Sequence, residues 1–178
     1  MKKLILTICL GNMVMSNAQI IIGDDVGSAT VKTSVLLEFP ANQNKGIILP
    51  YVRTLPTTPV EGTLLLDATD PTKASVKYYG AWVDLSGQNS NVTNALAIQP
   101  TASQVSELPA AKVIIGAQSS SANGVLVLES TTKSMVLPIV SDVQNIPSPS
   151  PGMIVYINKE GAKRLAIFNG SKWSYWKP

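Results

Sequence analysis

Residues 62–85, GTLLLDATDPTKASVKYYGAWVDL, recur later in the chain as residues 152–176, GMIVYINKEGAKRLAIFNGSKWSYW. Each copy opens with a glycine after a proline-rich stretch and continues with an apolar run, a polar turn and a second apolar run. A glycine turn and a tryptophan, Trp82 or Trp173, follow in each copy. Short apolar runs bounded by turn residues are typical of β-strands. Each copy is therefore predicted to form a three-stranded meander.

The similarity between the two halves extends upstream of these copies. The matching segments are residues 20–23 with 113–116, 34–38 with 125–129, and 45–50 with 133–138. Matches in the same order at a spacing of about 90 residues indicate an internal duplication. The chain is therefore predicted to contain two homologous β modules, residues 19–87 and 112–178, joined by a linker over residues 88–111.

The predicted fold class is all-β, with short antiparallel strands in a sandwich-like or fibre-like arrangement and almost no helix. The expected strands are 20–22, 31–39, 46–49, 62–67, 74–79, 81–85, 112–115, 124–129, 134–138, 152–157, 163–168 and 172–176. A single helical turn is expected from Thr101 toward Leu108, because Gln104 stands where a capping side chain belongs. The runs at 64–66 and 153–157 lack polar alternation, so a second sheet or a neighbouring chain is expected to cover both their faces.

The N-terminus has the three parts of a secretory signal peptide. Lys2 and Lys3 are followed by an apolar stretch, and residues 16–18, Ser-Asn-Ala, supply small residues for cleavage before Gln19. Residues 1–18 are therefore predicted to be a signal peptide, which places the protein outside the cell or on its outer surface. No transmembrane segment is expected in the rest of the chain. Without Lys2 and Lys3, 12 basic residues stand against 11 acidic ones, so nucleic acid is not an expected partner.

Several kinds of chemistry lack their residues in this sequence. The chain has no histidine, and its single cysteine, Cys9, falls in the predicted signal peptide. Histidine-based triads, cysteine nucleophiles and the usual zinc sites therefore have no candidates. The acidic residues show neither an EF-hand spacing nor a pair placed for glycoside hydrolysis. We expect a protein that is not an enzyme, with no catalytic residue, no cofactor and no metal.

Aromatic side chains are the candidate contacts for a ligand or partner. They are Tyr79, Trp82, Trp173, Tyr175 and Trp176. Exposed tryptophan and tyrosine rings can stack on sugars. Their recurrence in both modules favours the alternative that they fill the core or a subunit interface. Alternation along the strand puts Trp173 and Tyr175 on one face and Trp176 on the other, so one face is expected to meet solvent or a partner.

The motif order LLE, KG-I-LP, PxxxPxEG and VKYYGAWVDL resembles a β-repeat module of secreted Bacteroidota proteins. The ending of the second copy, residues 168–173, is similar to the YNG-x-x-W endings of phage tail-fibre modules. The first copy departs from the Bacteroidota pattern at Tyr51, where a second proline is common, and the second copy lacks a counterpart of Arg53. The resemblance implies an extracellular, fibre-like or surface-associated protein without catalytic residues.

The expected function is that of a secreted or surface-associated structural or adhesive protein, such as a subunit of an extracellular fibre. Its expected partners are further copies of the chain or another surface protein, since apolar strands with few charges leave edges that need covering. The alternative is a small carbohydrate-binding protein that uses the aromatic clusters, with a glycan as partner.

Overall fold

The computed structural model describes residues 19–101, 103–106, 108 and 110–176. The predicted signal peptide, including Cys9, lies outside the described residues. In chain order the strands are β1 Ile20–Ile21, β2 Val35–Glu38, β3 Ile47–Ile48, β4 Tyr51–Val52, β5 Leu64–Asp67, β6 Ser75–Tyr78, β7 Val83–Asp84, β8 Val113–Ile115, β9 Leu126–Leu128, β10 Ser134–Met135, β11 Ile139–Val140, β12 Met153–Ile157, β13 Arg164–Phe168 and β14 Trp173–Trp176. Helix α2 covers Thr93–Ala97, and a 3-10 helix, η1, covers Val143–Asn145.

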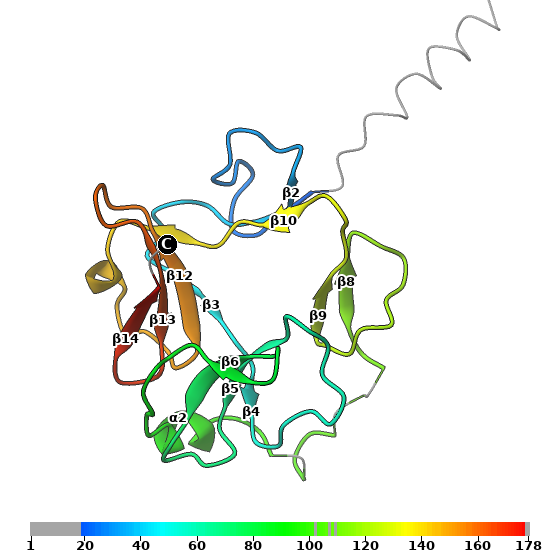
Figure 1. Cartoon of the computed structure of the whole chain (residues 1–178), viewed down its shortest axis with the longest axis vertical. Coiled ribbons are helices and arrows are strands. Elements are labelled where there is room, and N and C mark those ends of the chain that lie inside the picture. Colours follow the sequence, from blue (N-terminus) through cyan, green and yellow to red (C-terminus); the bar gives the residue numbers. More distant parts are fainter. Residues whose placement is uncertain (1–18, 102, 107, 109, 177–178) are drawn as a thin grey trace, which may run out of the picture.

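The all-β prediction is confirmed, and the described strands form four sheets. Figure 1 shows them around the middle of the molecule, with β2 and β10 at the top, β12–β14 at the left, β4–β6 at the bottom and β8–β9 at the right. The expectation of antiparallel strands holds for five of the ten pairings between described strands, and the other five are parallel. Apolar periodicity identifies a strand but does not reveal the direction of its neighbour.

The two halves of the chain repeat the same set of pairings. In the first half β1 pairs in parallel with β2, and β4 lies parallel to β5 at the start of the series β4-β5-β6-β7. In the second half β8 pairs in parallel with β9, and β11 lies parallel to β12 at the start of β11-β12-β13-β14. Strands β5–β7 and β12–β14 are the two meanders predicted from the sequence.

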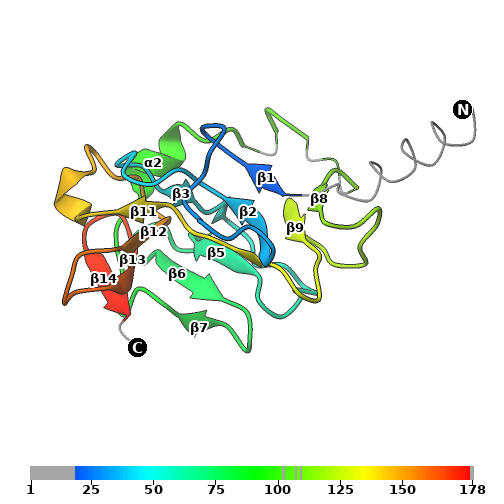
Figure 2. The ribbon, with the colours of Figure 1, turned by 90° about the horizontal axis from the view of Figure 1, so that it is seen from above.

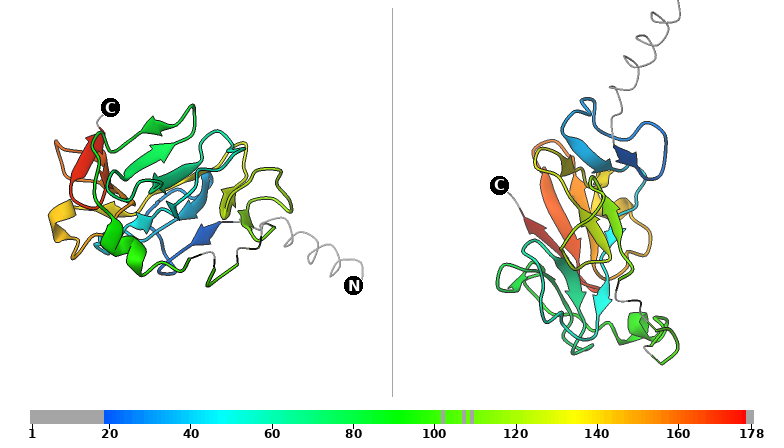
Figure 3. Two further views of the ribbon diagram at one scale, coloured as in Figure 1. Left: turned by 90° about the horizontal axis from the view of Figure 1, so that it is seen from below. Right: turned by 90° about the vertical axis from the view of Figure 1, so that its right-hand side faces the viewer.

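The modules also exchange strands. Strand β3 of the first half pairs antiparallel with β12 of the second, and β10 of the second half pairs in parallel with β2 of the first. Figure 2 labels β3 and β12, and Figure 1 labels β2 and β10. The two views in Figure 3 show the same mixing of early, blue to cyan segments with late, yellow to orange ones. Sheets are thus built from both halves of the chain.

The hydrophobic core is shared as well. One cluster combines Leu49 and Leu66 of the first half with Ile154 and Ile167 of the second, and all four side chains are buried. Burying one such side chain stabilises the fold by about 1.5–3 kcal/mol. The runs at 64–66 and 153–157, which were expected to be covered on both faces, supply several members of this and a second cluster.

Two short strands and the helix differ from the sequence predictions. Strands β4 and β11 were not predicted, because each is two residues long and directly follows a proline or a loop rather than an extended apolar run. The helix is α2, inside the predicted linker, where Leu96 turns into the shared core. At Thr101 the expected cap is present, since its N–H donates to Gln104 Oε1 at 2.9 Å, but it closes a turn and not a helix. No helix of the described residues is long and apolar enough to cross a membrane.

Candidate functional site

Three of the five candidate aromatics support the fold. Tyr79 and Trp82 meet edge to face with ring centroids 5.1 Å apart. In the second module Phe168 and Trp173 form a tilted pair at the same distance. The glycine that opens each meander donates its N–H to the first aromatic of the pair, Gly62 to Tyr79 O at 2.9 Å and Gly152 to Phe168 O at 2.8 Å. Each pair therefore closes its own meander, as the interpretation of a structural role predicted.

The other two aromatics, on strand β14, are exposed to solvent. The side chain of Tyr175 is 46% exposed, and the guanidinium of Arg164 lies 4.5 Å above its ring. Trp176 is 45% exposed and donates its indole N–H to the backbone carbonyl of Leu85 at 2.7 Å. Strand β14 of the second module is therefore hydrogen-bonded to the end of the first module through Trp176. Its Tyr175 and Trp176 side chains are at the same time exposed to solvent.

The five candidates do not come together in one hollow. They lie on the β6–β7 turn and on β14, which belong to different sheets. One surface hollow is lined by Gly46, Ile48 and Met153 together with polar loop residues, and another by Arg53, Leu96 and neighbouring polar residues. None of the five aromatics lines either hollow. Arg53, which belongs to the family-like motif, instead donates to Leu96 O at 2.8 Å and so holds the end of helix α2.

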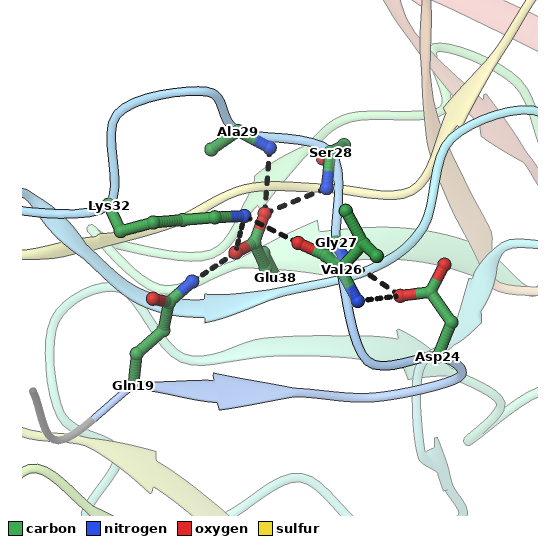
Figure 4. A network of polar contacts seen from close by, with 8 residues as sticks. All are labelled: Gln19, Asp24, Val26, Gly27, Ser28, Ala29, Lys32 and Glu38. Carbon is green, nitrogen blue, oxygen red and sulfur yellow. Dashed lines mark hydrogen bonds and ion pairs between the residues drawn. The ribbon is translucent and has the colours of Figure 1, made fainter.

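A buried carboxylate organises the loop between β1 and β2. Glu38 is fully buried and accepts backbone N–H bonds from Ser28 at 2.8 Å and Ala29 at 2.7 Å. Lys32 approaches its other oxygen at 2.5 Å, and the side-chain amide of Gln19 donates to that oxygen too (Figure 4). Glu38 therefore caps the loop that leads into its own strand.

The corresponding residue of the second module, Glu129, has the same kind of role. It follows β9 as Glu38 ends β2, and it accepts a hydrogen bond from Ser120 in the loop between β8 and β9. The match of residues 34–38 with 125–129 puts the two glutamates at equivalent positions of the repeat, each at the end of a strand. The sequence could not show that each one reaches back into the preceding loop.

Among the carboxylates with lowered pKa values, Glu38 and Asp67 are buried. Burial alone would raise the pKa of Glu38, but the hydrogen bond from Lys32 and the N–H bonds of Ala29 and Ser28 together lower it. Burial also opposes ionisation of Asp67, and bonds from Lys77, at 2.7 Å, and from Thr69 outweigh it and lower the pKa. Both groups therefore stay ionised at neutral pH and act as fixed anchors. Such groups are poor general acids at that pH.

Sequence reasoning missed one buried polar side chain. Asn169 is fully buried, and its amide donates to Gln88 O at 2.8 Å in the predicted linker. Its carbonyl oxygen accepts the N–H groups of Ser171 at 3.0 Å and Lys172 at 2.9 Å. The Asn169-Gly170 pair is typical of a tight turn, but the contact to Gln88 is made across the fold and has no local signature.

The described part of the chain holds no cluster of three or more histidine, cysteine or acidic residues that could bind a metal.

The most distinctive surface of the described chain is apolar. Val125 is 73% exposed, Leu126 is 49% exposed and Val113 is also exposed on the two-stranded β8–β9 sheet. Ile48 on β3 is 50% exposed. Apolar residues on short strands with a free edge are the surface chemistry of strand-to-strand association.

The fold and these surfaces define a class of protein: a duplicated β-repeat whose distinctive surfaces are apolar strand edges. Residues 114–177 match the family model of the phage tail-like trimerisation region. The match covers the second module from β8 to β14, and it supports the similarity to phage tail-fibre modules noted from residues 168–173. No curated protein matches the chain, and neither does any solved structure.

Proposed function

We propose that the protein is a non-enzymatic structural subunit that associates with copies of itself into a fibre-like assembly outside the cell. The observation that carries the proposal is the match of residues 114–177 to a phage tail-like trimerisation region. The half-exposed apolar residues on β3 and β9 support it, because self-association would remove them from water. Export rests on the signal peptide predicted at residues 1–18, and an adhesive role would follow from a position on the outer surface.

Two measurements test this proposal. The protein is produced in a bacterial host with its own N-terminus, and mass spectrometry of the exported product should show a chain that begins at Gln19. Sedimentation velocity and negative-stain electron microscopy of that product should show discrete oligomers or fibres. A chain retained in the cytoplasm would contradict the proposed location, and a species that sediments as one chain at every concentration would contradict the assembly.

Carbohydrate binding is a second candidate function, favoured by the exposure of Tyr175 and Trp176. Each ring offers apolar surface to a sugar, Tyr175 on one face of β14 and Trp176 on the other. Tryptophan fluorescence titrated with a panel of glycans tests it. A shift that disappears in Tyr175→Ala, with Trp82 intact as an internal reference, would support binding. A flat response to every glycan would remove this candidate and leave the assembly proposal standing.

A further inference from the structure

The two exchanged strands use opposite edges for their contacts within the chain. By the match of residues 45–50 with 133–138, Gly46 and Ile48 of the first module correspond to Ser134 and Val136 of the second. Strand β10 pairs with β2 through Ser134 N–H to Ser34 O at 2.9 Å and Val136 N–H to Leu37 O at 2.8 Å.

Strand β3 instead pairs with β12 through the alternate residues. Leu49 N–H donates to Gly152 O at 3.1 Å, and Ile47 lies opposite Ile154. Successive residues of a strand direct their N–H and C=O groups to opposite edges. Strand β3 therefore leaves the edge of Gly46 and Ile48 open, whereas β10 leaves the edge of Met135 and Leu137 open.

The strands that receive these partners show the reciprocal difference. Strand β9 corresponds to β2, and Leu128 corresponds to Leu37, whose carbonyl accepts the bond from β10. Among the described strands β9 pairs with β8 alone, so the edge at Leu128 has no strand beside it.

Strand β5 likewise corresponds to β12. Leu66 of β5 lies opposite Tyr51 of β4, just as Tyr156 of β12 lies opposite Ile139 of β11. Leu64, two residues before Leu66, is therefore the counterpart of Ile154. Leu66 and Ala68 donate to the first-module strand β4 and its flanking residues, so the alternate residue Leu64 faces the same edge. In β12, the counterpart of β5, this edge is paired with β3. No described strand pairs with β5 at the corresponding place.

We propose that a second copy of this chain fills both open edges. Strand β3 of one copy pairs in parallel with β9 of its neighbour, so that Ile48 N–H donates to Leu128 O. At the same boundary β10 of the neighbour pairs antiparallel with β5, so that Met135 lies opposite Leu64. The contact between copies thereby repeats the contact between modules. The proposed pair β3–β9 is the counterpart of β10–β2, and the proposed pair β10–β5 is the counterpart of β3–β12. This inference rests on the proposed self-association and names its interface.

The arrangement has a consequence for the shape of the assembly. Each boundary joins the second module of one copy to the first module of the next, so the contact is heterologous and head to tail. Such contacts close into a ring if the rotation permits and otherwise continue as a filament. Three copies would give a ring of six modules with the same strand pairs at every boundary. The half-exposed Ile48 and Leu126 then lie at the boundary between copies.

Engineered cysteines test the antiparallel pair directly, since the chain has no cysteine after Cys9. Thr63 and Val136 correspond to Met153 and Ile48, which face each other in the β12–β3 register. Met153 and Ile48 form a non-hydrogen-bonded pair beside the Leu49–Gly152 hydrogen bond. In such pairs the side chains are closest, so a disulfide fits. One chain carries Thr63→Cys and a second, differently tagged chain carries Val136→Cys, and the two are produced together. The in-chain control is Ile48→Cys with Met153→Cys.

The expected result is a disulfide-linked pair of the two tagged chains, while the control closes within one chain. An oligomer by light scattering that yields no linked pair would overturn the proposed pairing and leave self-association intact. A monomer in the same light-scattering measurement would overturn both.

A second variant probes the parallel pair and does not depend on disulfide geometry. Ile48→Pro removes an N–H that no strand of the described residues accepts, whereas Ile48→Ala keeps it. Ile48→Pro is expected to raise the dissociation constant of the assembly at least about tenfold over Ile48→Ala, with unchanged far-ultraviolet circular dichroism. Equal assembly of the two variants would rule out the β3–β9 contact.

Discussion

The backbone N–H of Leu49 donates to the carbonyl of Gly152 at 3.1 Å, which places a strand of the first module in a sheet of the second. The side chain of Leu49 is buried in the same cluster as Ile154 and Ile167. The duplicated halves therefore share both hydrogen bonds and core, and neither is complete without the other.

Leu49→Ala is expected to destabilise the whole described fold in one step. Removing a buried leucine side chain costs about 2–5 kcal/mol in the free energy of unfolding. Urea unfolding at a fixed protein concentration, followed by circular dichroism and tryptophan fluorescence, measures the change. Ile98→Ala, which truncates a side chain that is 88% exposed and lies outside the proposed contact between copies, is the control and should cost clearly less. Two separate transitions, with one unaffected by Leu49→Ala, would show that the modules fold independently.

Glu38→Gln is expected to lower stability at neutral pH by about 2 kcal/mol, because charge-assisted hydrogen bonds from Ser28, Ala29 and Lys32 lose their ionised acceptor. Glu129→Gln is the matched control in the second module. It is expected to cost less, since Glu129 is only partly buried. Thermal unfolding of both variants at one concentration measures the difference. Equal losses would contradict the claim that burial makes the Glu38 cap the stronger of the two.

The same carboxylate predicts a dependence on pH. Because the pKa of Glu38 is lowered in the folded state, its contribution is fully present above the ordinary glutamate pKa, about 4.3, and is lost as the pH falls through the folded value. Asp67 acts in the same direction. Unfolding free energies from pH 7 downward should show the gap between wild type and Glu38→Gln narrowing in acid. A gap that stays constant would contradict the lowered pKa.

Asn169→Ala is expected to cost about 2 kcal/mol or more, because it leaves the N–H groups of Ser171 and Lys172 and the carbonyl of Gln88 without their partner. Asn169→Asp retains the acceptor oxygen, but it loses the donor to Gln88 and buries a carboxylate against that carbonyl oxygen. Urea unfolding should therefore rank wild type above Asn169→Asp and Asn169→Ala. An alanine variant as stable as wild type would show that the turn holds without this side chain.

Apolar runs bounded by turn residues predicted twelve of the described strands close to their final positions. They did so because a run such as 153–157 carries its own strand propensity and burial. The pairings were not predictable in the same way. Parallel contacts such as β1–β2 and exchanged ones such as β3–β12 depend on segments distant in the sequence, and no local pattern encodes them.

For the candidate aromatics too, local features could be predicted from the sequence, whereas contacts with distant segments could not. The recurrence of Trp82 and Trp173 predicted a structural role, and each ring packs against a second aromatic ring of its own module. The hydrogen bonds from Trp176 to Leu85 O and from Asn169 to Gln88 O join residues 91 and 81 positions apart when the modules pack, and only the folded structure reveals them. The apolar edges of β3 and β9 are also visible only once their neighbours are placed.

Self-association of the chain is measured by the native mass of the exported protein in light scattering. The expected mass is a whole multiple of the chain mass, three times that mass for a ring of three copies, and it should stay constant on dilution until the dissociation constant is reached. The mass of a single chain at every concentration would contradict self-association.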